Sequence, residues 1–424
     1  MPRITSRYLV GATLLLMTVS IVNVADKELL APVVDAVKAD LGLSDTQIGA
    51  TRSAVFIAAL IGQLFWGPLS DRWVRKYIIA IGTVIWSALT WMTAFVGSFP
   101  QLLVARASMS FAEGCFNPSA YALLTDSVPR RRHGLILGLM GITYPVGTAA
   151  ALVVASVVGT ANWRLPFIYY GLIGLGLGVL VLFFIREPER GASEDAVEAV
   201  GGHYTGRFSL KEFRKLLTVP SLLLAFGLDT CQSIINWGFA FWAPTYLTRY
   251  SIAETPEQAA LALLPAILGF VVGAVLGGLL IDRMRHRTPL APAWVSLVAM
   301  AGGLALAALV FSLNTLGPLM AAAFCLGVVT YMVQPAVNVV LFSVVPPEMK
   351  ATTISASNVI LNLAVAVVSI SVGVVSDAAG LRLAFGGSVL LTYVAGVFVC
   401  LALLRNLGRD MQLRDAIVET RVSV

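Results

Sequence analysis

The decapeptide GPLSDRWVRK at 67–76 returns as GLLIDRMRHR at 278–287. Five positions hold the same or a similar residue in both copies, which lie 211 residues apart in a chain of 424. A second pair supports the repeat, because FNPSAYALLTDSVP at 116–129 matches VQPAVNVVLFSVVP at 333–346. The pattern indicates a tandem duplication, and a duplicated apolar bundle with a charged loop in each half is how one large class of solute carriers is built.

The composition points to a membrane protein. Hydrophobic residues make up 58% of the sequence and charged residues 12%, and the mean hydropathy is +0.85. Soluble domains carry about 25% charged residues. The apolar runs exceed the roughly 20 residues that cross hydrocarbon, and none alternates with a period of two, which predicts helices and not barrel strands. Stretches rich in Gly at 171–180 and 269–278 predict close helix packing in lipid.

The hydropathy pattern predicts twelve transmembrane helices, near 8–28, 46–70, 77–97, 101–125, 134–158, 164–185, 218–248, 258–281, 291–313, 316–343, 352–376 and 382–404. The termini and the loops on one side of this arrangement hold 22 of the 29 Lys and Arg residues. The positive-inside rule therefore predicts that both termini lie in the cytoplasm. The pI of 9.2 then reflects topology, and we expect no nucleic-acid partner.

We expect an all-α membrane protein of two six-helix halves, residues 1–190 and 216–424, related by a pseudo-twofold axis along the membrane normal. Residues 191–215 form the predicted cytoplasmic linker with an interfacial helix, because Phe208, Leu210 and Phe213 share one helical face. The four cysteines all fall in predicted spans, which argues against a disulfide framework or a CxxC metal site. With no Walker loop, metal cluster or nucleophile elbow, we expect neither an enzyme nor a cofactor.

Ionisable side chains inside predicted spans are the main functional candidates, because they are costly in lipid and usually face a cavity. Arg106, Glu113 and Asn117 fall at i, i+7 and i+11, one stripe of a continuous helix. The rise per residue places Asp26 at the depth of Arg106, so we expect these two to pair. All three histidines lie in loops, so Glu113 is the predicted protonation site. The alternative is a permanent strut of Asp26 and Arg106 with a satisfied, buried Glu113.

Other polar residues in the spans are candidates to line a substrate cavity. They are Arg52, Tyr144, Asp229, Gln232, Asn236, Trp237, Tyr331, Asn338 and Asn358. A single polar residue in a span more often joins helices than binds a ligand. Arg52 could bind an anionic headgroup or extend its charge to the interface. Asp229 could face the substrate, or a neighbouring hydroxyl could satisfy it.

The whole chain resembles the major facilitator superfamily, whose best signature is the GxLxDRxxRK loop, although Val74 stands where that family usually has Gly. Within it, NVADK at 23–27, RASMSFAEG at 106–114, YPVG at 144–147 and REPERG at 186–191 resemble the spinster-like lipid transporters. Organic-anion symporters of the same superfamily share DLGLSDTQIG at 40–49 and the Arg and Glu of span 4.

The resemblance implies a proton-linked carrier whose coupling network is Asp26, Lys27, Arg106 and Glu113. Lys27 stands where spinster-like proteins normally have Arg, which weakens bidentate carboxylate pairing there. The resemblance also implies a cytoplasmic latch that holds the outward-open state. Its residues are Asp71 and Arg72, with Asp282 and Arg283 as the weaker counterpart.

The predicted function is secondary active transport by alternating access, with proton symport or antiport and an amphiphilic lipid or lysolipid as substrate. The alternative is a proton-coupled organic-anion or drug carrier. A channel is the other class to weigh, but two repeats with paired loops favour a rocking carrier. We expect a monomer in the bacterial inner membrane, whose partners are the small amphiphilic substrate, protons and membrane lipids.

Overall fold

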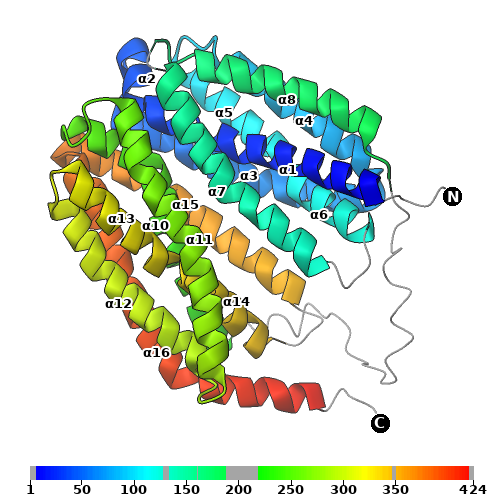
Figure 1. Ribbon diagram of the computed structural model, residues 1–424, viewed down its shortest axis with the longest axis vertical. Coiled ribbons are helices and arrows are strands. Elements are labelled where there is room, and N and C mark those ends of the chain that lie inside the picture. Colours follow the sequence, from blue (N-terminus) through cyan, green and yellow to red (C-terminus); the bar gives the residue numbers. More distant parts are fainter. Residues whose placement is uncertain (1–5, 128–132, 160, 188–217, 346–349, 420–424) are drawn as a thin grey trace. The chain divides into compact units, whose positions relative to one another are not determined.

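The computed structural model describes residues 6–127, 133–159, 161–187, 218–345 and 350–419 (Figure 1). The chain separates into two compact units, Met1–Val200 with Thr255–Ala260, and Gly201–Glu254 with Leu261–Val424. Within the described ranges, nine helices are long and apolar enough to cross a membrane. The predicted all-α membrane class is confirmed. The interfacial helix predicted before residue 216 lies outside the described residues.

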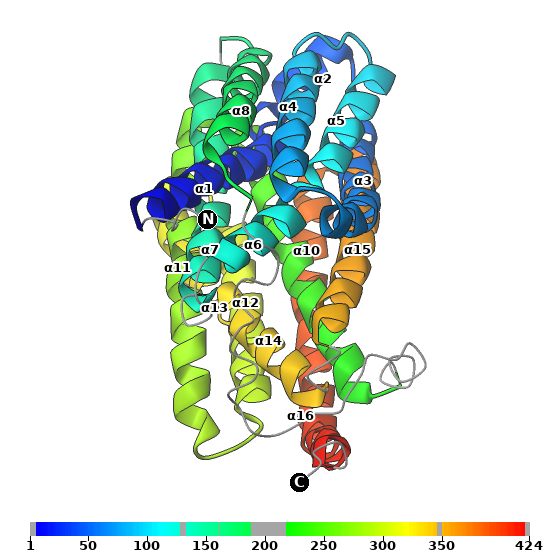
Figure 2. The ribbon, with the colours of Figure 1, turned by 90° about the vertical axis from the view of Figure 1, so that its right-hand side faces the viewer.

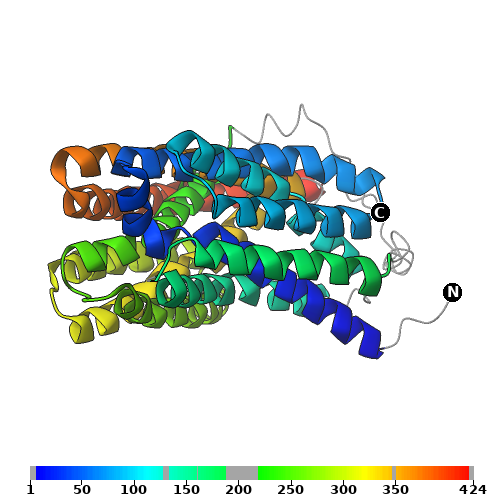
Figure 3. The same cartoon turned by 90° about the horizontal axis from the view of Figure 1, so that it is seen from above.

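The helices of the first unit follow in chain order: α1 (Ser6–Glu28), η1 (Ala31–Val33), α2 (Val34–Leu41), α3 (Asp45–Arg72), α4 (Arg75–Thr93), α5 (Phe99–Glu113), α6 (Phe116–Ser127), α7 (His133–Gly159) and α8 (Leu165–Phe184). α4 packs along α8, and α1 packs against both α7 and α8 (Figure 3). The packing of α4 and α8 is close because α8 presents glycines: a Cβ atom on Gly174 would lie 2.1 Å from Oγ of Ser87. This confirms the helix packing predicted for 171–180.

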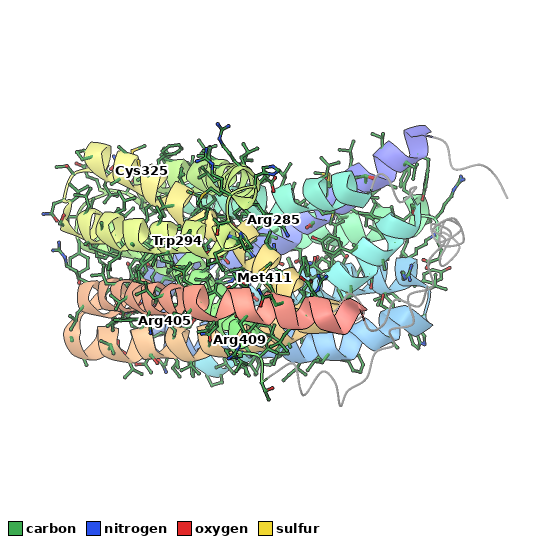
Figure 4. The ribbon with its side chains drawn as sticks, turned by 90° about the horizontal axis from the view of Figure 1, so that it is seen from below. Arg285, Trp294, Cys325, Arg405, Arg409 and Met411 are labelled. Atoms are coloured by element: carbon green, nitrogen blue, oxygen red, sulfur yellow. The ribbon has the colours of Figure 1, made fainter. Side chains whose placement is uncertain are left out.

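The second unit contains α10 (Pro220–Arg249), α11 (Pro256–Arg285) from Leu261 onward, α12 (Ala291–Ser312), α13 (Leu316–Tyr331), α14 (Val333–Val344), α15 (Lys350–Ala379), the π-helical turn η5 (Arg382–Gly386) and α16 (Gly387–Glu419). α16 packs against α10 and α12, and Figure 4 labels Arg405 and Arg409 along it. A Cβ atom on Gly273 of α11 would lie 2.1 Å from the carbonyl oxygen of Val328 in α13. The close packing predicted for 269–278 is confirmed.

Local sequence explains how α2 turns into α3. Gly42 ends α2 in the left-handed conformation, with φ of 64°, which glycine adopts without steric cost. Ser44 then begins α3 with a capping box: its Oγ accepts from the backbone N–H of Gln47 at 3.2 Å, and Oε1 of Gln47 accepts from the N–H of Ser44 at 3.0 Å. These bonds satisfy two free amides at the start of a long membrane helix.

The fourth and tenth predicted spans are each interrupted at the same point of the repeat. α5 and α6 are separated by Gly114 and Cys115, and α13 and α14 by Met332 (Figure 2). Pro118 and Pro335 follow these breaks as the third residues of α6 and α14. Proline lacks an N–H donor, and its ring clashes with the carbonyl four residues earlier, which favours a break at these two positions. The equivalence of the two spans is therefore confirmed.

A third internal repeat, which the sequence analysis did not find, is visible in the contacts. Arg164 precedes Leu-Pro-Phe and Arg382 precedes Leu-Ala-Phe. Nη2 of Arg164 donates to the carbonyl oxygen of Val96, just after α4, at 3.3 Å, and Nη2 of Arg382 donates to that of Phe311, near the end of α12, at 2.7 Å. In each unit an arginine thus stabilises the end of the corresponding helix.

Candidate functional site

The carboxyl end of α1 is held by two arginines from other helices. The last carbonyls of a helix have no partner within that helix and carry partial negative charge. Nη2 of Arg106, from α5, donates to the carbonyl oxygens of Asp26 at 2.9 Å and Lys27 at 3.1 Å. Nη1 of Arg52, from α3, donates to the same Lys27 oxygen at 3.0 Å. The two guanidinium groups therefore cap α1 inside the first unit.

Lys27 and Glu113 form a loose ion pair beside this cap. Nζ of Lys27 lies 3.6 Å from Oε2 of Glu113, beyond the 2.7–3.2 Å range that is usual for a hydrogen bond. The Lys27 side chain is 22% exposed, whereas that of Glu113 is fully buried. Nζ of Lys27 also donates to Oδ1 of Asn23 at 3.3 Å. Neither carboxylate oxygen of Glu113 has a hydrogen-bond partner among the described residues. Charge alone holds this contact.

The carboxylate of Asp26 is bonded differently from what the sequence predicts. Its Oδ2 accepts a hydrogen bond from the hydroxyl of Thr90 in α4, and its Oδ1 is buried with no hydrogen-bond partner in the described part of the chain. Arg106 reaches Asp26 through the backbone carbonyl, and not through the carboxylate. The expected side-chain pair is therefore wrong in this detail, because the free carbonyls at the end of α1 bind the guanidinium.

Arg52 is paired with an acid that the sequence analysis did not single out. Its Nη2 lies 2.8 Å from Oε1 and 3.1 Å from Oε2 of Glu28, and both side chains are buried. Arg52 thus does not extend to the interface. A buried arginine requires a counter-ion, so an acid near the end of a neighbouring span, such as Glu28, was the available signal.

The predicted stripe of Arg106, Glu113 and Asn117 does not hold across its full length. Arg106 and Glu113 are both buried in α5, but Asn117 is exposed in α6. The stripe assumed one continuous helix, and the break at Gly114 and Cys115 changes the direction in which later side chains point.

The second unit brings Asp229 of α10 together with a neutral donor. The hydroxyl of Ser357, in α15, donates to Oδ2 of Asp229 at 2.5 Å. The side chain of Gln334, in α14, lies near this carboxylate. The neighbouring hydroxyl considered in the sequence analysis is thus present. Gln232 and Asn236 are buried one and two turns further along α10.

The remaining cavity candidates are spread over several environments. Trp237 lines a small aromatic pocket within the second unit, together with Phe241, Trp242 and Phe385. Tyr331 stacks on Phe270, with ring centroids 4.3 Å apart. Tyr144 and Asn358 are half-buried, and Asn338 is exposed.

The structure describes the predicted latch only in part. The side chains of Asp71 and Arg72 lie outside the described residues. Asp282 and Arg283 are exposed near the end of α11. Glu187 binds beside the first copy: its Oε1 accepts from the backbone N–H of Arg75 at 3.2 Å, and its Oε2 from that of Lys76 at 2.9 Å. This carboxylate caps the start of α4, at the last two residues of the decapeptide 67–76.

Comparisons with known proteins agree with this architecture. The model of the Major Facilitator Superfamily matches residues 16–369. A probable sulfoacetate transporter of Cupriavidus necator is 28% identical, with 71% of this chain and 72% of that protein aligned. The sphingosine-1-phosphate transporter of Danio rerio is 22% identical, with 69% of this chain and 60% of that protein aligned. The crystal structure of an inward-facing bacterial spinster homologue superposes with a TM-score of 0.83 at 20% identity, over 96% of this chain and 99% of that chain.

These matches confirm the predicted superfamily, the likeness to spinster proteins and the fold class. The family model covers most of the chain, including the second half of α1, all of α5 and the charged groups between them. The family consists of transporters and not of enzymes. This chain belongs to the major facilitator superfamily and is a multi-pass membrane transporter.

Proposed function

We propose that the protein is a proton-coupled secondary transporter that moves an amphiphilic lipid or lysolipid by alternating access. One observation carries the coupling part: Glu113 is buried, its carboxylate has no hydrogen bond from the described residues, and its nearest cation, Lys27, lies at 3.6 Å. A buried carboxylate held only by a loose ion pair is poised to exchange its counter-ion for a proton. Asp26, Lys27, Arg106 and Glu113 together form the proposed coupling network.

The proposed coupling step uses the position of Lys27. Protonation of Glu113 removes the charge that holds the ammonium group. Lys27 can then keep its bond to Asn23 and turn toward an anionic group of the substrate. Arg106 and Arg52 remain on the carbonyls of α1 and keep its end in place. In this mechanism the arginines position α1, and the pair of Lys27 and Glu113 responds to the proton.

The lipid substrate is supported by the likeness to the sphingosine-1-phosphate transporter of Danio rerio. A second candidate, an organic anion, is favoured by the comparable likeness to the probable sulfoacetate transporter of Cupriavidus necator. Both classes of substrate carry an acidic group that Lys27 could bind. We further propose a monomer in the bacterial inner membrane, with both termini cytoplasmic and Asp71, Arg72, Asp282 and Arg283 acting as latch.

A binding screen separates the two substrate classes. The purified full-length protein is titrated with lysophospholipids and with small organic acids, and the shift in melting temperature is recorded. The proposal expects lysophospholipids to stabilise the protein in a saturable way. Saturable stabilisation by small acids alone would replace the lipid proposal with the organic-anion one.

The variant Asp71→Asn tests the latch. The accessibility of introduced cysteines is expected to shift toward the inward-open state, and an unchanged pattern of accessibility would contradict the latch.

A further inference from the structure

One face of α10 carries a row of polar side chains deep in the second unit. Asp229, Gln232 and Asn236 are spaced three and four residues apart, so they lie on the same side of the helix. All three are at least nine-tenths buried, and Gln232 is not exposed at all. We name these three residues the α10 polar stripe. They are the most polar part of a helix that is otherwise mainly apolar and aromatic.

The carboxylate of Asp229 is bonded by a neutral group. The hydroxyl of Ser357 donates to it at 2.5 Å, and among the described residues no Lys, Arg or His forms an ion pair with Asp229. A carboxylate inside a membrane bundle is costly when no positive charge compensates it. The described part of the chain therefore supplies no cation to this site.

The amides of the stripe also lack partners. Both polar atoms of the Gln232 side chain and Oδ1 of Asn236 have no hydrogen-bond partner among the described residues. Buried amides in native proteins are nearly always hydrogen-bonded. A proton on Asp229 would remove its charge, but it would leave the amide oxygens of Gln232 and Asn236 unsatisfied. A ligand that brings several N–H donors and one positive charge would satisfy the carboxylate and both amide oxygens, while the amide nitrogen of Gln232 would require an acceptor on the same ligand.

We propose that the α10 polar stripe binds the ammonium group of the transported substrate. An ammonium carries three N–H donors and no acceptor, which matches one carboxylate and two amide oxygens on a single helix face. This inference rests on the proposed lipid function and narrows it to amphiphiles whose headgroup contains an amine. Acids without an amine, such as sugar acids, would not complete the site.

A matched pair of lipids tests the inference. Lysophosphatidylethanolamine and lysophosphatidylglycerol with the same acyl chain share the phosphate, and only the first has an ammonium group. Affinities are measured for the full-length protein in detergent, for Asp229→Asn, and for the control Asp415→Asn, which changes an exposed acid of α16. We expect the native protein and the control to prefer the ethanolamine lipid by about tenfold to a hundredfold. Asp229→Asn is expected to lose this preference and still bind the glycerol lipid.

The possible outcomes separate the inference from the proposed function. Equal binding of the two lipids by the native protein, or a preference that survives in Asp229→Asn, would overturn the ammonium site and leave lipid transport standing. If neither lipid binds, the lipid proposal fails. The same variants are then titrated with ethanolamine phosphate and glycerol phosphate, where a preference that depends on Asp229 keeps the site and its absence overturns it. Should Asp229→Asn not fold, Gln232→Met replaces it, with an expected loss of about threefold to tenfold for the ethanolamine lipid.

Discussion

Nζ of Lys27 lies 3.6 Å from Oε2 of Glu113, whereas Nη2 of Arg52 lies 2.8 Å from Oε1 of the adjacent Glu28. The two ion pairs lie at the same end of α1 but differ in distance, hydrogen bonding and burial. Arg52 and Glu28 are joined by hydrogen bonds and buried together, while Glu113 has only the charge of a partly exposed lysine. The tight pair is suited to holding structure, and the loose pair is suited to opening when Glu113 takes a proton.

The tight pair is expected to be costly to break. Glu28→Gln or Arg52→Gln alone should lower the free energy of unfolding by about 3 to 5 kcal/mol, because each strands a buried charge. The double change Glu28→Leu with Arg52→Met should recover most of the loss. Recovery should be incomplete, because Arg52 also bonds the carbonyl of Lys27. Chemical denaturation or melting of the purified variants measures these effects.

The exposed pair of Arg414 and Asp415 serves as the control, since its side chains are 26% and 57% exposed. Removing either charge there should change stability by less than about 1 kcal/mol. If the single changes at Glu28 and Arg52 were as mild as those of the control, the two residues would not form a buried pair.

The contribution of Arg106 to stability is expected to depend on the geometry of its side chain and not only on its charge. Nη2 of Arg106 donates to both carbonyl oxygens, and its Nη1 contacts Sδ of Met109. Arg106→Lys keeps the positive charge but is shorter and has a single nitrogen, so it should lose about 1 to 3 kcal/mol of stability. Asp26→Asn should not rescue Arg106→Gln, because the carbonyl partners of Arg106 remain when the carboxylate is changed. A double-mutant cycle on melting temperature measures this. Full recovery in the double variant would identify the carboxylate as the true partner.

The glycines of α8 and α11 allow a matched test of helix packing. Gly174 and Gly273 have no room for a Cβ atom, whereas Gly176 and Gly278, on the same helices, have nothing within 4 Å of one. All four changes to Ala gain similar helix propensity. Gly174→Ala and Gly273→Ala should therefore destabilise the protein by about 1 to 3 kcal/mol through overpacking, while the other two should be neutral or slightly stabilising. Equal melting temperatures for all four variants would refute the close packing.

Features that depend on spacing along the chain were predictable from the sequence. The repeats placed GPLSDRWVRK and GLLIDRMRHR at the ends of α3 and α11, and the prolines of the second repeat marked the helix breaks before α6 and α14. Glycine-rich stretches predicted close helix contact because glycine has no side chain to keep two helices apart. These features can be read from the sequence because helix rise and proline geometry are set by the residues themselves.

Contacts between side chains of different helices were harder to predict. The depth of Asp26 correctly placed it near Arg106, but depth does not say whether a guanidinium will bind a carboxylate or a free carbonyl at a helix end. Glu28 was missed because it lies at the predicted end of a span, where an acid is usually solvated. Ser357 is the partner of Asp229 because of how α15 is rotated about its axis, and the sequence of a mostly apolar helix does not reveal that rotation.

Transport by Glu113→Gln in sealed proteoliposomes tests proton coupling most directly. Substrate movement is measured under an imposed pH gradient of either sign and, separately, as exchange of labelled for unlabelled substrate without a gradient. Because glutamine cannot gain or lose a proton, we expect gradient-driven movement to fall to the level of empty vesicles while exchange continues and the melting temperature is kept. Gradient-driven movement equal to that of the native protein would contradict proton coupling through Glu113. Loss of exchange together with a lowered melting temperature would show instead that Glu113 is a structural residue.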